Sequence, residues 1–152
     1  MIEADYIWVD GEMIPWEEAQ VHVLSHALHY GSGVFEGIRA YETPEGTAVF
    51  RLRDHMERLH RSAAAYGMTL DWLVDELCVA SRKVLDANEL TAGYLRPLVF
   101  HELGAIGLDP RKARIRTIIA AWEWGAYLGE EGVRNGIKTR VSRWKRFPSA
   151  SF

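Results

Sequence analysis

The sequence predicts an α+β fold, in which an antiparallel sheet carries two helices on one of its faces. Three observations lead to this prediction. An Asp-Gly pair joins two short apolar runs near the N-terminus, two amphipathic helical patterns follow each other between residues 53 and 88, and segments rich in β-branched and aromatic residues lie before and after them. Because strands come first, then a helical pair and then strands again, both helices are expected to cover the same side of the sheet.

The first predicted element is a tight hairpin. Its strands are Tyr6–Val9 and Glu12–Ile14, and Asp10 and Gly11 stand between them. An Asp-Gly pair accepts the positive φ angles that a two-residue turn requires. The hairpin is therefore expected to begin the sheet.

Two helices are predicted next. The first covers residues 53–66, where apolar residues recur at steps of three and four, and Gly67 follows as a left-handed end residue. The second starts after Asp71 as its N-cap and ends near Asn88, with Cys78 inside it as a packed thiol. The apolar stripes consist of Met56, Leu59, Ala63 and Tyr66 in the first helix and of Trp72, Leu73, Leu77, Ala80 and Val84 in the second.

Three more strands are predicted, at residues 33–41, 93–100 and 115–122. Together with the earlier elements they define a first domain over residues 1–124. Glycines punctuate the next stretch, which lacks periodicity, so residues 125–135 are predicted to be an interdomain loop. Residues 136–152 are too short for a domain and are expected to begin a larger one, with a strand-like start.

Composition excludes several classes of protein. With 48% hydrophobic residues, the chain of 152 residues is expected to fold around a core. Its 18 basic and 21 acidic side chains give a formal charge of −3, which provides no general attraction to nucleic acid or to anionic lipid. The apolar stretches are shorter than a membrane span, and the N-terminus lacks a signal-peptide pattern. A single cysteine, Cys78, favours a cytoplasmic location.

Three histidines are candidates for a metal site. His22, His26 and His29 have helical spacing, which could place three imidazoles on one face. No H-E-x-x-H pattern accompanies them, and isolated histidines more often cap a helix, pack or form hydrogen bonds. No metal site is therefore predicted.

The glycine-rich segment after these histidines favours a different chemistry. Residues 31–37 are similar to a dinucleotide-binding turn, but the third glycine comes one residue late and a strand follows instead of a helix. A period of two places Phe35, Gly37, Arg39 and Tyr41 on one face of this strand. Gly37 would then leave a gap where a small anionic substrate could approach. A bulge at Gly37 beside a solvated Arg39 is the alternative, and spacing alone leaves both open.

The same periodicity aligns Tyr94, Arg96, Leu98 and Phe100 on one face of the strand at 93–100. A phenol beside a guanidinium suits a carboxylate, because arginine offers a two-pronged donor and tyrosine adds a directional one. An edge strand with an exposed Arg96 is the alternative, which Pro97 favours because it lacks a backbone donor.

Two basic features have simple structural explanations. Arg58 follows Asp54 by one helical turn, so an ion pair between them is the plain interpretation. The stretch Arg134–Arg146 is basic and contains Trp144, with Phe147 just after it, a composition that could bind single-stranded nucleic acid. A solvated segment, or a surface covered by further chain, is favoured instead, and no nucleic-acid partner is predicted.

Six motifs in order along the chain resemble the fold type IV pyridoxal-phosphate enzymes, and among them the branched-chain amino acid aminotransferases. The resemblance implies the small N-terminal α+β domain of that fold, of the type found in D-amino acid aminotransferase. It also implies a cofactor, pyridoxal 5′-phosphate, between this domain and a larger one. The motifs are Tyr6–Met13, Val21–Gly31, Val34–Arg39, His55–His60, Tyr94–Leu98 and Trp124–Gly129.

The resemblance also assigns roles to individual residues. Arg58 would hold the cofactor phosphate, and Arg39 would support the pocket wall. Tyr30 would reach into the site of a neighbouring subunit, which implies at least a homodimer. Phe35 and Trp124 would surround an aliphatic side chain, and carboxylates would be bound by Tyr94, Arg96 and Tyr127. The implied substrate pocket consists of Tyr30, Phe35, Gly37, Arg39, Tyr94, Arg96, Trp124 and Tyr127.

The implied activity is transfer of an amino group between leucine, isoleucine or valine and 2-oxoglutarate, giving branched-chain 2-oxo acids and glutamate. The family's lysine, which forms a Schiff base with the cofactor, belongs to a motif expected beyond Phe152, so no catalytic residue is assigned and the chain alone is expected to be inactive. The alternatives are a D-amino acid aminotransferase, an aminodeoxychorismate lyase of the same fold, or a non-catalytic binding module.

Overall fold

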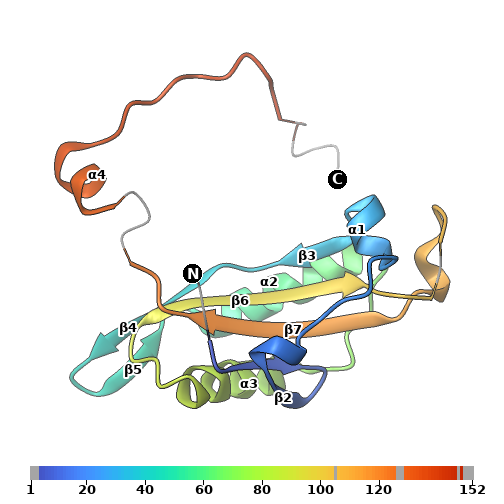
Figure 1. Ribbon diagram of the computed structural model, residues 1–152, viewed down its shortest axis with the longest axis horizontal. Coiled ribbons are helices and arrows are strands. Elements are labelled where there is room, and N and C mark those ends of the chain that lie inside the picture. The colour runs from blue at the N-terminus through green and yellow to red at the C-terminus, as the bar shows by residue number, and fades with distance from the viewer. Residues whose placement is uncertain (1–3, 105, 126–128, 147, 149–152) are drawn as a thin grey trace.

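The computed structural model describes residues 4–104, 106–125, 129–146 and 148, and its centre is a seven-stranded antiparallel sheet (Figure 1). The strands follow the order β2-β1-β7-β6-β4-β5, and β3 also pairs with β6. The strands are β1 (Tyr6–Val9), β2 (Glu12–Pro15), β3 (Gly33–Phe35), β4 (Ile38–Thr43), β5 (Gly46–Val49), β6 (Gly93–His101) and β7 (Ile115–Trp122). The helices are α1 (His26–Tyr30), α2 (Leu52–Ala65), α3 (Val74–Ala87) and α4 (Gly129–Asn135), with 3₁₀ turns at Trp16–Glu18 and Pro110–Lys112.

The predicted hairpin forms between β1 and β2. Asp10 and Gly11 have φ angles of 45° and 100°, as the two-residue turn requires. A side chain at Gly11 would lie 2.6 Å from the ring of Trp72, so this position has neither the backbone freedom nor the space for another residue. The turn therefore fixes the register of β1 and β2 and also seats Trp72 beneath it.

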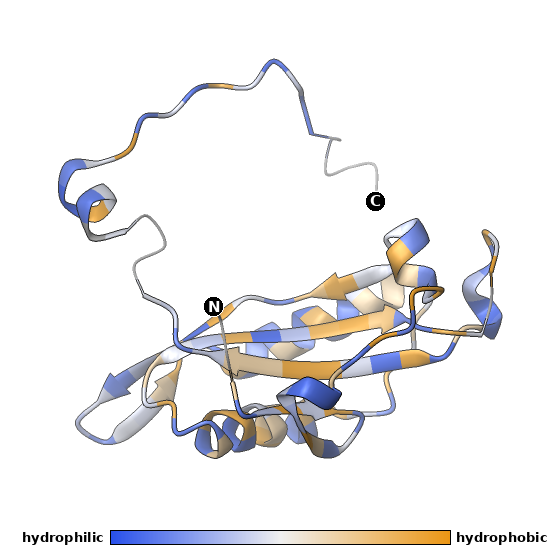
Figure 2. Cartoon of the chain, in the orientation of Figure 1, coloured by the Kyte–Doolittle hydropathy of each residue, from blue (hydrophilic) through white to orange (hydrophobic). Residues whose placement is uncertain are grey.

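The two long helices, α2 and α3, pack on one face of the sheet, as predicted. Met56, Leu59 and Ala63 of α2 are buried together with Leu77 and Val84 of α3. Gly67 follows α2 with a φ of 70°, which confirms it as the left-handed end residue. Apolar residues are concentrated on the central strands β6 and β7 (Figure 2). The strand residues in this core are Trp8, Val34, Ile38, Ala40, Leu95, Val99, Ile119 and Ala121.

The start of the second helix was predicted wrongly. Asp71 is not its N-cap, because α3 begins at Val74 and the N–H of Leu73 donates to the carboxylate of Glu76 (2.7 Å). Trp72, assigned to the helical stripe, instead packs edge-on against Trp8, with ring centroids 5.0 Å apart. This contact holds residues before Leu73 in a non-helical path. Tyr66 and Leu73, also assigned to the stripes, are exposed.

The predicted strand at 33–41 is interrupted at Glu36 and Gly37, which separates β3 from β4, and the separate strand β5 was not predicted. The interruption faces Pro97, whose carbonyl accepts from the N–H of Glu36 (2.9 Å). In an antiparallel pair the N–H and C=O of one residue point to the same neighbouring strand, so proline withholds a donor at this point. The edge-strand alternative for β6 is wrong, since β6 pairs with β7 on one side and with β3 and β4 on the other.

Residues after Trp124 also differ from the prediction. Helix α4 forms within the stretch expected to be a loop, and residues 137–141 form no strand. Every described residue from 134 to 146 is exposed, including the basic side chains considered for nucleic acid. Cys78 packs at the edge of the core as predicted, where burial raises the pKa of its thiol. Among the described residues, no helix has the length and apolar character needed to span a membrane.

Candidate active site

The face of the sheet opposite the helices carries the predicted pocket residues. Burial alternates along residues 34–41 as expected, with Val34, Ile38 and Ala40 buried and Phe35 and Tyr41 exposed. Strand β6 continues this face with Tyr94, Arg96, Leu98 and Phe100. In the register of β6 and β7, Arg96 lies opposite Ala120 and Tyr94 lies opposite Trp122. Small residues on both sides, Ala120 and Gly37, therefore leave room around Arg96.

The guanidinium of Arg96 lies among aromatic rings. Its central carbon is 4.5 Å from the ring centroid of Phe35 and 5.4 Å from that of Tyr94. One of its terminal nitrogens donates to the Tyr94 hydroxyl at 3.3 Å. The ring faces hold the cation by electrostatic attraction and leave its donors available. Phe35 is 61% exposed, so one side of this pair is open to a ligand.

Gly37 makes this arrangement possible. A Cβ built at Gly37 would overlap the hydroxyl oxygen of Tyr94 and lie 2.9 Å from its Cζ atom. The tyrosine hydroxyl therefore occupies the space that a side chain at Gly37 would take. The gap predicted from the sequence exists, and the phenol of Tyr94 fills part of it.

Trp122 belongs to the same cluster, although it was not predicted. Its ring centroid lies 5.2 Å from that of Tyr94 and 5.7 Å from that of Trp124, and Tyr94 and Trp124 are 4.8 Å apart. Within the described part of the chain, the buried Nε of Arg96 and Nε1 of Trp122 have no hydrogen-bond partner. Buried donors without partners are costly, so this cluster is suited to a ligand that supplies acceptors. Its position opposite Tyr94 in the strand register was the signal that could have identified Trp122.

Arg58 reaches the same edge of the sheet from the helix layer. Its Nε donates to Oε1 of Glu36 at 2.7 Å and its Nη2 donates to Oε2 at 2.5 Å. Nδ1 of His55 lies 2.9 Å from Oε2. The predicted ion pair with Asp54 is absent, because Asp54 binds Arg51 instead. Burial would raise the pKa of Glu36, but the hydrogen bonds from Arg58 and His55 outweigh it and lower that pKa, while Glu36 raises the pKa of Arg58.

The remaining predicted pocket residues lie elsewhere. Arg39 pairs with Tyr94 across the strands and stacks near the ring of Tyr41 at 5.9 Å. Tyr30 ends helix α1 at the other end of β6, where it packs on His26 with ring centroids 4.5 Å apart. Within one chain it is therefore apart from the Arg96 cluster. Tyr127 lies outside the described residues.

The three histidines do not converge on one point. His26 is buried, with Nδ1 2.6 Å from the Ser32 hydroxyl and Nε2 2.8 Å from the carbonyl of Gly107. His22 accepts from the N–H of Leu24, and His29 lies 2.9 Å from the carbonyl of Val23. No cluster of metal-ligating side chains occurs among the residues that the structure describes. These histidines bind backbone and hydroxyl groups.

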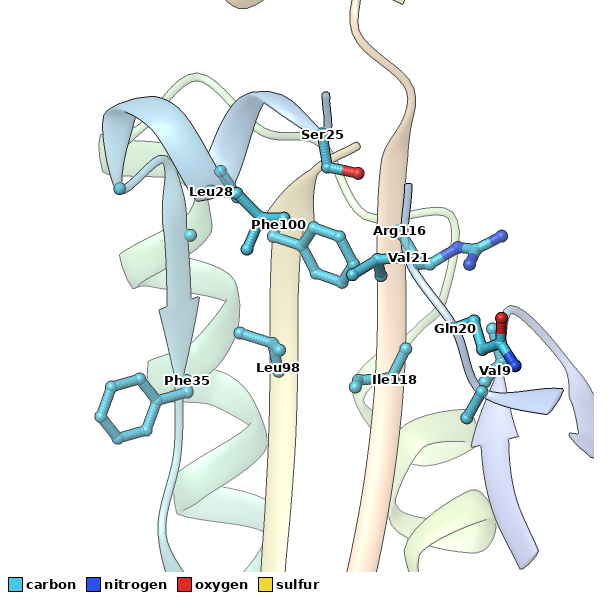
Figure 3. Close-up of a pocket in the computed structure, with 14 residues that line it drawn as sticks. Val9, Gln20, Val21, Ser25, Leu28, Phe35, Leu98, Phe100, Arg116 and Ile118 are labelled. Carbon is cyan, nitrogen blue, oxygen red and sulfur yellow. The ribbon is translucent and has the colours of Figure 1, made fainter. Parts of the chain in front are cut away.

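An apolar cavity of about 420 Å³ adjoins Phe35 on the open face. Figure 3 shows Leu98 on β6 and Ile118 on β7 at its floor, with Leu28 from α1 and Val21 above. Nearly all of its lining is apolar, whereas the Arg96 cluster next to it presents donors. The open face thus offers an apolar wall and a cationic group side by side, an arrangement typical of small-molecule sites.

Comparisons with known proteins agree with this architecture. The family model described as amino-transferase class IV matches residues 33–152. The branched-chain-amino-acid aminotransferase of Escherichia coli (strain K12) is 51% identical over 147 residues, which cover 95% of this chain and 47% of that protein. That of Pseudomonas aeruginosa is 49% identical over 140 residues, covering 92% and 46%. The chain thus spans about half the length of these relatives.

Solved structures show the same similarity. The E. coli branched-chain amino acid aminotransferase superimposes with a TM-score of 0.92 at 50% identity, covering 97% of this chain and 49% of that one. The enzyme of T.th., solved with pyridoxamine 5′-phosphate, gives 0.91 at 46% identity, covering 100% and 50%. The fold is that of the small N-terminal domain of fold type IV aminotransferases, as predicted. The family match spans most of the sheet and both long helices, and the chain therefore belongs to the class IV aminotransferases.

Proposed function

We propose that the complete protein is a pyridoxal 5′-phosphate-dependent aminotransferase that moves an amino group between leucine, isoleucine or valine and 2-oxoglutarate. The observation that carries the proposal is Arg96, held over the Phe35 ring beside an apolar cavity. Such a site can meet an aliphatic side chain with its wall and a carboxylate with its guanidinium. Support comes also from relatives about 50% identical that are named branched-chain-amino-acid aminotransferases.

The residues present fit the cofactor's phosphate. A guanidinium has five N–H donors, and Glu36 takes two of those on Arg58. Three donors remain on a side chain that is 59% exposed, enough for a two-pronged bond to a phosphate. When bound, the cofactor supplies the electron sink that makes the proton on the substrate α-carbon removable.

The protein's own residues then handle two unlike substrates in one pocket. With leucine, the side chain would pack on Phe35 and Trp124, and Arg96 would stay over the aromatic rings. With 2-oxoglutarate, Arg96 and the Tyr94 hydroxyl would bind the distal carboxylate, satisfying the buried donors of the cluster. Because ring faces give up a cation more readily than a buried carboxylate does, this switch costs little.

The site is also proposed to be shared between subunits. Tyr30 lies apart from the Arg96 cluster of its own chain and is 45% exposed at the tip of α1. It is free to contact a second copy, so we expect at least a homodimer. Sedimentation of the complete protein tests this expectation, and a monomer at micromolar concentration would contradict it. Cytoplasmic location belongs to the same proposal, and cell fractionation tests it.

Amino-donor profiling of the complete protein tests the function. Purified protein with bound cofactor would be given 2-oxoglutarate and, in turn, L-leucine, L-isoleucine, L-valine and D-alanine. Glutamate formation from the three branched-chain donors is expected, with D-alanine inert. Turnover of D-alanine but not of L-leucine would favour a D-amino acid aminotransferase and overturn the proposal. Absence of turnover with every donor would favour a non-catalytic binding module.

A further inference from the structure

Glu36 is an acidic side chain in a position that the sheet reserves for apolar residues. It falls in the interruption between β3 and β4 and alternates with Val34 and Ile38, both of which are buried. Its side chain is only 4% exposed, yet it is ionised and hydrogen-bonded on both oxygens. Carboxylates are rarely buried to this extent unless they are paired, so its partners explain its presence.

Those partners come from one face of α2. Arg58 donates to both oxygens of Glu36, and His55, one turn earlier, lies within hydrogen-bond distance of Oε2. The two donors on one edge of the guanidinium meet the two carboxylate oxygens, which fixes the plane of the guanidinium as well as its position. The opposite edge of Arg58 faces outward, since the side chain is 59% exposed.

The acid one turn before Arg58 does not compete for it. That acid, Asp54, forms an ion pair with Arg51 at 2.5 Å. Arg58 is thus directed to Glu36, 22 residues away in sequence, and not along its own helix. An arginine side chain free in solvent samples many rotamers, and ordering it on binding a ligand costs affinity.

We propose that Glu36 is a positioning residue for phosphate binding, which holds the outer edge of Arg58 in the orientation that a phosphate monoester requires. The proposal rests on the proposed function, in which that phosphate belongs to pyridoxal 5′-phosphate or pyridoxamine 5′-phosphate. Glu36 does not touch the ligand. Its effect passes through the guanidinium, with His55 holding the second oxygen of Glu36 in place.

The proposal is tested on the complete apoprotein with pyridoxamine 5′-phosphate and with pyridoxamine, which differ only in the phosphate. Neither carries an aldehyde, so the ratio of the two dissociation constants isolates the contribution of the phosphate. The variants are Glu36→Gln, which keeps the size of the side chain, and Glu36→Asp, which keeps the charge but shortens its reach. Arg58→Lys serves as the reference, and Asp54→Asn is the matched control on the same helix.

Glu36→Gln is expected to weaken binding of pyridoxamine 5′-phosphate about tenfold, or ~1.4 kcal/mol, and to leave pyridoxamine unchanged. Glu36→Asp is expected to act in the same direction, and Asp54→Asn to change neither ligand. In an Arg58→Lys background, Glu36→Gln is expected to have no further effect on the ratio, because it acts through the guanidinium. A purely structural role would weaken both ligands together.

Two results would overturn the proposal. One is an unchanged ratio in both Glu36 variants while Arg58→Lys lowers phosphate binding, and the other is tighter phosphate binding in Glu36→Gln, which would show that Glu36 only repels the ligand. If Glu36→Gln does not fold, the Glu36→Asp ratio decides. If Arg58→Lys itself leaves the ratio unchanged, the phosphate role of Arg58 in the proposed function fails instead.

Discussion

Two arginines lie near one edge of the sheet, and their surroundings differ. Arg58, on the helix side, is locked to the buried carboxylate of Glu36 by two hydrogen bonds. Arg96, on the open face, rests on aromatic rings, and its buried Nε has no partner within the described part of the chain. A guanidinium fixed by a buried anion suits a ligand that stays bound. One held by ring faces suits a ligand that enters and leaves in every catalytic cycle.

The largest effect is expected from Arg96→Met. Removing the guanidinium should lower kcat/KM for 2-oxoglutarate about 100-fold, or ~2.7 kcal/mol, because a charged partner of the distal carboxylate is lost. The loss for the oxo acid of leucine, which lacks that carboxylate, should be below about tenfold. Steady-state kinetics on the complete protein with both oxo acids measures the difference. Equal losses for the two substrates would show that Arg96 does not discriminate between them.

Glu36→Gln should come next, in stability. The pKa of Glu36 is lowered from its ordinary value of 4.5, so its ionised form stabilises the fold above about pH 4.5, and this contribution is lost as the pH falls through the folded-state pKa. At neutral pH the variant should lose about 2 kcal/mol in free energy of unfolding. The gap to the wild type should shrink in acid. Urea denaturation across this pH range checks it, and a gap that widens on acidification would contradict the assignment.

Gly37→Ala sharpens the account of the open face. The added methyl overlaps the Tyr94 hydroxyl, so the ring must move away from Arg96. We expect about a tenfold fall in kcat/KM for 2-oxoglutarate, or ~1.4 kcal/mol, with little change in stability. Gly125→Ala is the control, because a Cβ there meets no other atom within 4 Å. If Gly37→Ala keeps full activity, Tyr94 does not need its observed position.

The smallest effect is expected from Asp54→Asn. This residue forms an ion pair with Arg51 in which both side chains are more than half exposed. Solvent screens such pairs, so the loss should stay below about 0.5 kcal/mol in free energy of unfolding. Urea denaturation in parallel with Glu36→Gln makes the contrast between an exposed and a buried carboxylate on the same arginine-rich surface. A loss as large as that of Glu36→Gln would remove the contrast.

Much of the fold could be predicted because its signals are local. The Asp10-Gly11 turn, the α2 stripe ending at Gly67, and the alternation around Gly37 all depend on neighbours in sequence. The start of α3 could not, because Trp72 leaves the helix to pack against Trp8, far away in the chain.

The candidate site shows the same division. Phe35, Tyr94 and Arg96 could be aligned on one face from a period of two, whereas the partner of Arg58 could not be identified from spacing. The i,i+4 rule indicated Asp54, and the true partner is Glu36, between two strands. One signal was present, because the alternation that exposes Phe35 and Gly37 also buries the acid between them. A buried acid requires a cation, and α2 carries Arg58 and His55 nearby.

The most direct test of the account compares Arg58→Lys with Arg96→Lys in the complete protein. For each variant, the dissociation constant for pyridoxamine 5′-phosphate and the KM for 2-oxoglutarate are measured. Lysine keeps the charge but loses the two-pronged geometry, so each variant should impair its own ligand. The account predicts a crossed result: Arg58→Lys weakens the phosphate ligand alone, and Arg96→Lys raises the KM alone. Two variants that impair both ligands to the same degree would contradict it.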